Sequence, residues 1–163
     1  MATVVYLALG SNLGDRAAMI DAAIAALDSE GLLQELVASA LYETDAVADD
    51  PQPPYLNAVV RGSTRLDAAA LLDGCLAVEA RLGRVRPAGV AKAARVIDID
   101  LLLFGDAIIH HPPTLIVPHP GLLARAFVRI PLADVASAGR THPITHAPLT
   151  VAAPSPTVRR FVR

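Results

Sequence analysis

Two aspartates, Asp98 and Asp100, stand two residues apart in an otherwise apolar, largely β-branched run. Side chains with this spacing lie on the same face of a β-strand, about 6.5 Å apart along the chain. Two carboxylates on one face repel each other unless a cation neutralises them. Magnesium usually takes one or two carboxylates and completes its shell with water and phosphate oxygens. The pair therefore predicts metal-dependent nucleotide chemistry, although a strand with one solvated face would also explain alternating polar residues.

A run of cations comes directly before this pair, in a segment that also contains proline and glycine: Arg84, Arg86, Lys92 and Arg95. Charged loops of this kind are often only solvated. Beside a metal site, however, a cationic loop can close on a polyphosphate and neutralise its oxygens. We therefore expect these arginines to contact phosphate groups.

Glu79 lies four residues after Cys75 on the apolar stripe of a helix that should begin near Asp67. Two interpretations are open for this carboxylate. It either reaches solvent from the edge of the stripe, or points inward and orients an arginine of the cationic loop.

The elements that must position these residues follow from the hydrophobic pattern. Strands are expected at residues 3–9, 32–44, 55–64 and 95–104, with helices after Asp15 and from Asp67. This order predicts an α+β, ferredoxin-like fold, an antiparallel sheet with helices packed mainly on one face.

The C-terminal third of the chain is rich in proline. Residues 121–136 have helical content, which Pro131 should interrupt or restart. After Gly139 we expect loops with a short final element, and a solvated tail that carries Arg159, Arg160 and Arg163.

Composition limits the class of protein. At 163 residues and 53% apolar, the chain is expected to form one domain, residues 1–163, with a sizeable core. The net charge of −2 and only three tyrosines and three phenylalanines argue against a nucleic-acid partner. There is no recognisable signal peptide or spanning apolar run, and the single cysteine suits a reducing compartment. We therefore expect a cytoplasmic protein with no membrane partner.

Several segments, in this order along the chain, carry a family resemblance: Gly10-Ser11-Asn12, Tyr55-Leu56-Asn57-Ala58, Arg95 to Asp106, Val117-Pro118-His119-Pro120, and Arg125 to Leu132. Together they resemble the 6-hydroxymethyl-7,8-dihydropterin pyrophosphokinases of folate biosynthesis, which move a pyrophosphoryl group from ATP to the pterin hydroxymethyl group. The resemblance is collinear from about residue 3 to residue 136.

The resemblance implies a ferredoxin-like fold that holds ATP and pterin side by side. It implies that Asp98 and Asp100 hold two Mg²⁺ ions on the triphosphate. The pterin hydroxyl would then attack the β-phosphorus in line, with AMP leaving. Arg84 and Arg95 would share the catalytic role with the two aspartates. The residues implied in ATP binding are Glu79, Arg84, Arg86, Arg95, His119 and Arg125.

On the pterin side, the resemblance implies that Tyr55 and Phe127 sandwich the heterocycle. Asn57 would read its polar edge, with backbone near Thr44 contributing. A flat, polar, uncharged ring binds well between aromatic faces when a few polar groups are placed to hydrogen-bond with it. The resemblance thus implies small-molecule substrates, ATP and hydroxymethyldihydropterin, and functional coupling to neighbouring folate enzymes.

The cationic loop differs from the family pattern. Lys92-Ala93-Ala94 stand where the family commonly has Trp-Gly-Pro before the arginine. One alternative is therefore a catalytically silent relative that keeps the pterin or nucleotide pocket. Retention of both Asp98 and Asp100 favours an active enzyme. An RNA-recognition module would lack its aromatic strand motifs here, and another metal-dependent nucleotidyl or glycosyl transferase would not explain Tyr55, Asn57 and Phe127 together.

Overall fold

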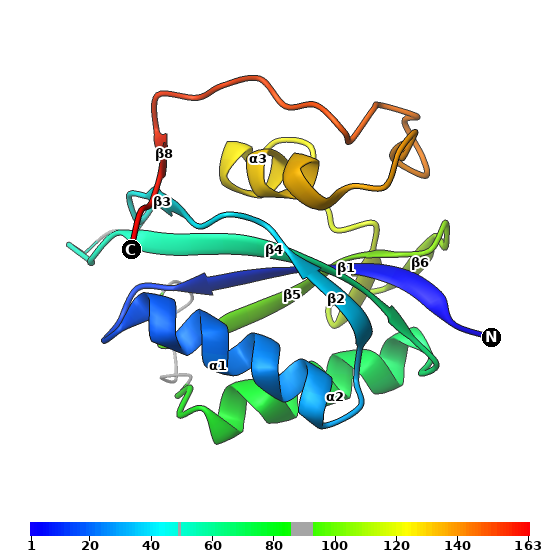
Figure 1. Cartoon of the computed structure of the whole chain (residues 1–163), viewed down its shortest axis with the longest axis horizontal. Helices are drawn as coiled ribbons and strands as arrows, with labels where there is room; N and C mark the ends of the chain where they lie inside the picture. The colour runs from blue at the N-terminus through cyan, green and yellow to red at the C-terminus, as the bar shows by residue number, and fades with distance from the viewer. Residues whose placement is uncertain (49, 86–92) are drawn as a thin grey trace.

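The computed structural model describes residues 1–48, 50–85 and 93–163. Its centre is a six-stranded antiparallel sheet (Figure 1). The strands run in the order β5-β1-β4-β3-β8, and β2 also pairs with β4. Their bounds are Thr3–Ser11 for β1, Gln34–Ala38 for β2, Tyr42–Thr44 for β3, Tyr55–Thr64 for β4, Asp98–Phe104 for β5 and Val158–Arg160 for β8. A separate two-stranded sheet pairs β6, Ile109–His111, with β7, Leu115–Val117.

Three helices cover the large sheet. Helices α1, Arg16–Ser29, and α2, Ala68–Arg81, lie together on one face, and α3, Ala126–Val135, lies on the other (Figure 1). The order strand, helix, strands, helix, strand from β1 to β5 confirms the predicted α+β, ferredoxin-like arrangement. None of the helices in the described part of the chain is long and apolar enough to cross a membrane.

The helices begin where the sequence pattern predicts. Asp15 caps α1 by accepting a hydrogen bond from the backbone N–H of Ala18, and Asp67 caps α2 in the same way through Ala70. Such caps satisfy N–H groups that have no partner inside the helix. Both helices pack on the larger apolar core, whereas α3 closes a second core around Tyr6 and Leu102 on the opposite face.

Three expectations about elements were wrong in detail. The strand expected at residues 32–44 is two strands, β2 and β3, separated by residues 39–41, where the backbone N–H of Ala40 donates to Asp134 and not to β4. Pro131 lies inside α3 rather than interrupting it. Pro131 is buried, and burial of its ring offsets the backbone hydrogen bond that proline cannot donate. The short final element expected after Gly139 is β8, so Arg159 and Arg160 belong to a strand and not to a tail, although their side chains and that of Arg163 are exposed as expected.

The register of β1 brings two distant segments together. Gly10 is the cross-strand neighbour of Asn57 in β4 and of Asp98 in β5, and Ala8 is the neighbour of Asp100. Residues directly opposite in antiparallel strands share a face of the sheet. Because Gly10 and Ala8 have small side chains, little material covers the sheet between β5 and β4. The carboxylates of Asp98 and Asp100 therefore face the Asn57 amide across an open part of the sheet, which forms the floor of a cavity.

Candidate active site

A cavity of about 400 Å³ lies on this floor. Residues of β1, β4 and β5 form one side of it, and the segment that leads into α3 forms another. Predicted site residues from all parts of the chain line it: Thr44, Tyr55, Asn57, Arg95, Asp98, Asp100, His119, Arg125 and Phe127. Arg84 and Glu79 lie beside it in contact with Asp98 or its strand, and Arg86 lies outside the described residues.

Asp98 and Asp100 enter the cavity from the same face of β5. Burial raises the pKa of Asp100 to about 7, and the negative charges of Asp98 and Glu79 contribute to the increase. The folded protein therefore holds several carboxylates close enough to repel one another, an arrangement that a cation would relieve.

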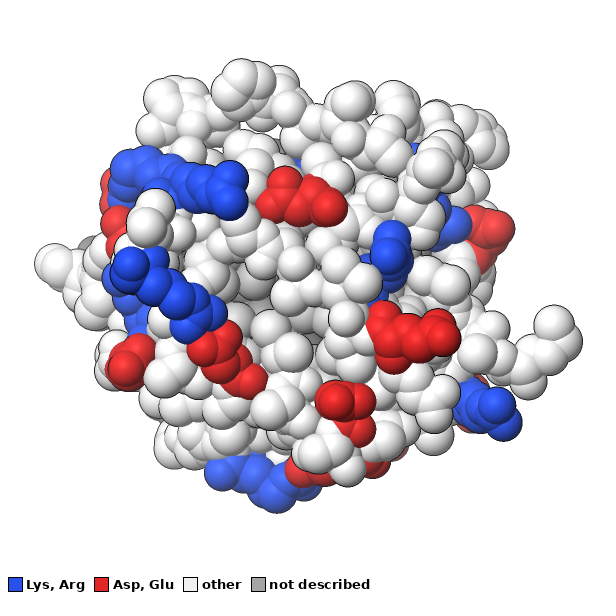
Figure 2. Space-filling model, viewed as in Figure 1, with Lys and Arg blue, Asp and Glu red and all other residues white. Residues whose placement is uncertain are grey.

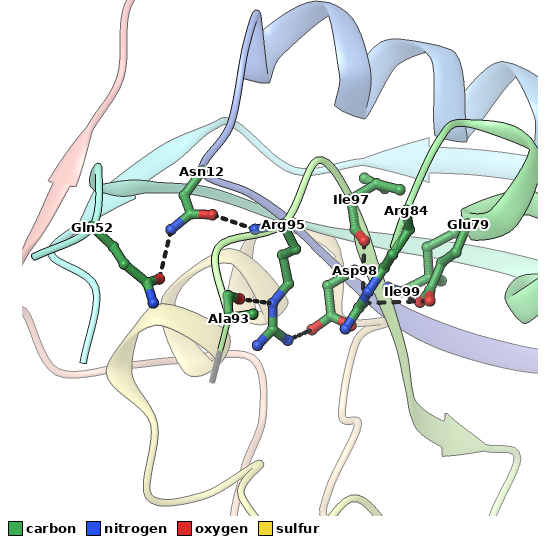
Figure 3. A network of polar contacts seen from close by, with 9 residues as sticks. All are labelled: Asn12, Gln52, Glu79, Arg84, Ala93, Arg95, Ile97, Asp98 and Ile99. Carbon is green, nitrogen blue, oxygen red and sulfur yellow. Dashed lines mark hydrogen bonds and ion pairs between the residues drawn. The ribbon is translucent and has the colours of Figure 1, made fainter. Parts of the chain in front are cut away.

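Two arginines meet at Asp98 (Figure 3). Arg84 donates to Oδ1 of Asp98, and Nη1 of Arg95 lies 3.1 Å from Oδ2. The side chain of Arg84 is only 7% exposed. Arg95 lines the cavity and Arg84 lies beside it, so two guanidinium groups stand next to the Asp98 carboxylate.

Glu79 points inward from α2, which decides between the two interpretations of its sequence position. It is 2% exposed, and its Oε2 accepts a hydrogen bond of 2.8 Å from the backbone N–H of Ile99 in β5. Its Oε1 lies 3.4 Å from Nη1 of Arg84. Because Ile99 separates the two aspartates, Glu79 fixes both the strand that carries them and the arginine beside them.

His119 and Arg125 form the side of the cavity near α3. Nδ1 of His119 accepts a hydrogen bond of 3.0 Å from the backbone N–H of Gly121. A neutral ring bound in this way carries its proton on Nε2. Burial and the charge of Arg125 lower the pKa of His119, which favours the neutral ring. Arg125 packs over Gly121, where a Cβ atom would lie 2.6 Å from its Nε, and its guanidinium lies 5.9 Å from the ring centre of Phe127.

On the opposite side of the floor, β4 presents Tyr55 and Asn57 two residues apart. Asn57 is 8% exposed, and its Nδ2 makes a long hydrogen bond of 3.4 Å to the carbonyl of Tyr42. Burial raises the pKa of Tyr55. Together with Phe127, these residues give a half-apolar pocket with a buried amide, suited to a flat polar ring.

One residue of this site was missed from the sequence. Asn12 is 1% exposed, and its Oδ1 accepts a hydrogen bond of 2.8 Å from the backbone N–H of Arg95. Its Nδ2 donates to Oε1 of Gln52 at 3.1 Å (Figure 3). The same nitrogen donates to the carbonyl of Pro53 at 3.1 Å. The sequence placed Asn12 in the Gly10-Ser11-Asn12 segment of the family resemblance but gave it no role. The polar character of Asn12 was the available signal, but its partners are about 40 and 80 residues away.

We expect the oxygen and the nitrogen of the Asn12 amide to support different sides of the cavity, the oxygen through Arg95 and the nitrogen through Gln52 and Pro53. Asn12→Asp keeps the acceptor for Arg95 but loses the donor to Gln52 and Pro53, so it should raise KM for the substrate beside that loop. Asn12→Ala loses both contacts, and each charged or buried hydrogen bond lost should cost about tenfold in kcat/KM. Steady-state kinetics with each substrate varied in turn would measure this. Identical profiles for the two variants would contradict the division of roles.

The chain was compared with known proteins. It matches the family described as 7,8-dihydro-6-hydroxymethylpterin-pyrophosphokinase (HPPK) over residues 6–137. A 2-amino-4-hydroxy-6-hydroxymethyldihydropteridine pyrophosphokinase of Methylorubrum extorquens is 42% identical over 134 residues, which cover 82% of this chain and 83% of that protein. The protein of the same name from Bacillus subtilis is 38% identical over 135 residues, 83% of this chain and 79% of that protein.

Other relatives are much longer. The folic acid synthesis protein fol1 of Schizosaccharomyces pombe is 36% identical over 90% of this chain, which spans only 19% of that protein. A solved structure of Plasmodium falciparum HPPK-DHPS superposes with a TM-score of 0.70 at 16% identity, over 92% of this chain and 43% of that one. This structural likeness supports the fold, and the family match with the shorter relatives supports membership. The chain belongs to the 7,8-dihydro-6-hydroxymethylpterin-pyrophosphokinase family.

Proposed function

We propose that this chain transfers the pyrophosphoryl group of ATP to 6-hydroxymethyl-7,8-dihydropterin, giving AMP and the pterin diphosphate in folate biosynthesis. One observation carries the proposal beyond family membership. Asp98 and Asp100 face Asn57 and Tyr55 across the small residues of β1 in a single cavity. A polyphosphate subsite and a subsite for a flat polar ring therefore adjoin each other, as transfer between two such substrates requires.

We also propose that Asp98 and Asp100 hold Mg²⁺, as two ions with ATP. The donor set fits this metal. In the described part of the chain, no three His, Cys, Asp or Glu side chains are grouped to hold a metal ion. Magnesium commonly binds through one or two carboxylates plus water and substrate phosphates, so a pair of aspartates suffices. Bound there, the ions would neutralise the phosphate oxygens and the charge that develops during transfer.

The residues of the chain position the substrates and supply charge. Arg84, Arg95 and Arg125, with His119, would donate to phosphate oxygens. Tyr55, Phe127 and Asn57 would hold the pterin so that its hydroxyl oxygen lies in line with the β-phosphorus. The bond from that oxygen to the β-phosphorus forms, and the bond from the β-phosphorus to the bridging oxygen of AMP breaks. The hydroxyl proton is released. No covalent enzyme intermediate is needed, because phosphoryl transfer depends mainly on positioning and electrostatics.

The test is the formation of AMP from ATP and Mg²⁺, with and without 6-hydroxymethyl-7,8-dihydropterin. AMP in proportion to added pterin is expected. Tight binding of pterin or nucleotide by calorimetry without AMP would favour the alternative of a silent binding module, for which the Lys92-Ala93-Ala94 segment is the best support. ADP in place of AMP would indicate a different transferase.

Phe127→Ala should weaken pterin binding far more than ATP binding. Loss of one stacking ring is expected to raise the Kd for pterin about ten- to a hundredfold, with the Kd for an ATP analogue nearly unchanged. Calorimetry with each ligand measures both. Phe127→Tyr keeps the aromatic face and is the matched control. Equal losses for both ligands in Phe127→Ala would mean that Phe127 only supports α3 and Arg125.

We further propose that the protein is cytoplasmic and is functionally coupled to other folate enzymes. The chain corresponds to one portion of fol1 and of HPPK-DHPS, which supports functional coupling to other folate enzymes. The single cysteine, Cys75, is buried and free, in keeping with a cytoplasmic protein. Acidic and basic side chains are interspersed on the face shown in Figure 2, which suits small-molecule substrates better than a nucleic acid.

A further inference from the structure

The C-terminal segment lies beyond the family match, which ends at residue 137, yet it extends the sheet beside the cavity. Strand β8 pairs with β3, so that Arg159 is opposite Glu43 and Val158 is opposite Thr44. The ladder continues past β8, because the backbone N–H of Phe161 donates to the carbonyl of Leu41 at 2.9 Å. Figure 1 shows this end of the chain folding back against β3.

Arg16, the first residue of α1, lies at the same place and binds both ends of the loop between β3 and β4. Its Nη1 donates to Oε2 of Glu43 at 2.8 Å and to the carbonyl of Pro54 at 2.9 Å. Glu43 is in β3 just before the loop, and Pro54 is the last residue before β4. One partly buried cation, 21% exposed, thus joins the entry of the loop to its exit.

The C-terminal segment holds Arg16 in this position. The ring of Phe161 packs against the larger core, and its centre lies 5.5 Å from the guanidinium carbon of Arg16. Arg159 donates to Asp45 at 3.1 Å and to Glu43 at 3.4 Å, but these ion pairs are exposed and contribute little on their own. Figure 2 shows basic side chains gathered next to acidic ones at this end of the molecule.

The loop that Arg16 closes forms one wall of the cavity. Thr44, Asp45, Val47 and Gln52 line the cavity, and Tyr55 follows directly after the loop. Asn12 binds the same loop through Gln52 and Pro53, directly before Pro54. Arg16 therefore fixes the start and the end of the loop, and Asn12 fixes its end a second time. Of these two residues, Asn12 also contacts Arg95 on the cationic side of the cavity.

We infer that Arg16 is a positioning residue for the pterin subsite, and that the C-terminal strand supports it through Phe161. The inference rests on the proposed function, because it assigns this wall of the cavity to the pterin. Arg16 is not among the residues that line the cavity, so it acts through the loop. The β3–β4 ladder already pairs Thr44 with Tyr55, so what Arg16 holds is the loop between them, whose residues line the pterin side of the cavity.

Arg16→Met tests the inference, because methionine keeps an unbranched apolar stem and loses both hydrogen bonds. We expect KM for the pterin to rise about tenfold, as for one lost hydrogen bond to a charged group, with KM for ATP within twofold. Arg16→Lys should recover most of this loss, because a single nitrogen makes both contacts and an ammonium can replace it. Phe161→Leu should cause a smaller change of the same kind, about threefold, since leucine keeps an apolar contact with the core but loses the ring contact with Arg16.

Arg163→Met is the matched control. It also removes an arginine that joins the C-terminal segment to α1, by a bidentate pair with Asp21 at 2.6 and 2.7 Å, but it does not contact the loop. Both KM values should stay unchanged. Equal increases of both KM values in Arg16→Met, an unchanged pterin KM, or no recovery in Arg16→Lys would overturn the inference. The wild-type assay separates the two proposals: absence of pterin-dependent AMP there refutes the function, whereas an active wild type with an unaffected Arg16→Met refutes only the role of Arg16.

Discussion

Replacing Asp100 by asparagine should abolish most pyrophosphoryl transfer while leaving the protein folded and no less stable. We expect kcat to fall by about a thousandfold, the upper end of the cost of losing one preorganised electrostatic group. The carboxylate is the proposed ligand for Mg²⁺, and a neutral amide binds this ion poorly. Single-turnover AMP formation at saturating ATP and pterin measures the effect.

The stability of the same variant gives an independent readout. The pKa of Asp100 is raised to about 7, above its ordinary value of 3.8, by burial and by neighbouring carboxylates. The folded state therefore binds more protons than the unfolded state between these two pH values, and stability falls as the pH rises through this window. Asp100→Asn removes that penalty, so the metal-free variant should melt at the same or a higher temperature than wild type above pH 7.

Asp98→Asn is the informative companion. Asp98 accepts from Arg84 and Arg95 and so contributes to stability, whereas Asp100 is repelled by its neighbours. We expect Asp98→Asn to lose a similar share of activity but also some thermal stability. Near-wild-type turnover of either variant in Mg²⁺ would show that the metal assignment is wrong.

Replacing Arg84 by methionine should lower kcat by about a hundred- to a thousandfold, with much smaller changes in KM. The guanidinium of Arg84 is nearly buried between Glu79 and Asp98, and it also donates to the carbonyl of Ile97 at 3.1 Å. Its position is thus set by the protein before any substrate binds. Binding of Mg²⁺ by Asp98 would release Arg84 from that carboxylate, while Glu79 and Ile97 still hold the guanidinium in place. Its charge would then stabilise the transition state, which is why the loss should appear in kcat.

Arg81→Met controls for the loss of a helix-end arginine. Arg81 also ion-pairs with a glutamate, Glu30, but its side chain is 52% exposed and far from the cavity-lining residues. Its replacement should leave the kinetics unchanged. Glu79→Gln should cause part of the Arg84→Met loss, and the double variant should lose less than the product of the two, because the residues act as a unit. Strictly multiplicative losses would mean that Glu79 does not position Arg84.

The sequence predicted the parts of the site that depend on local pattern. The alternation in β5 indicated that Asp98 and Asp100 share a face, and the spacing of Tyr55 and Asn57 indicated the same for β4. The caps at Asp15 and Asp67 and the stripe that buries Cys75 and Glu79 follow from helical periodicity. Family resemblance supplied roles for these residues, and the structure places most of them around one cavity.

What the sequence could not reveal depends on contacts between distant segments. Asn12 shows no partner nearby in the sequence, yet it joins Arg95 to Gln52 and Pro53. In the sequence, residues 158–160 look like part of a charged tail. They form a strand only by pairing with the edge of β3, which lies far away along the chain.

The sequence by itself thus determined which residues could do the chemistry, since residue type and local periodicity are written along the chain. Only the tertiary structure decided how they meet. The register of β1 places its two small residues, Ala8 and Gly10, between β5 and β4, and this opens the floor of the cavity. Register and edge pairing arise from the cooperative packing of the whole sheet, so no local segment contains them.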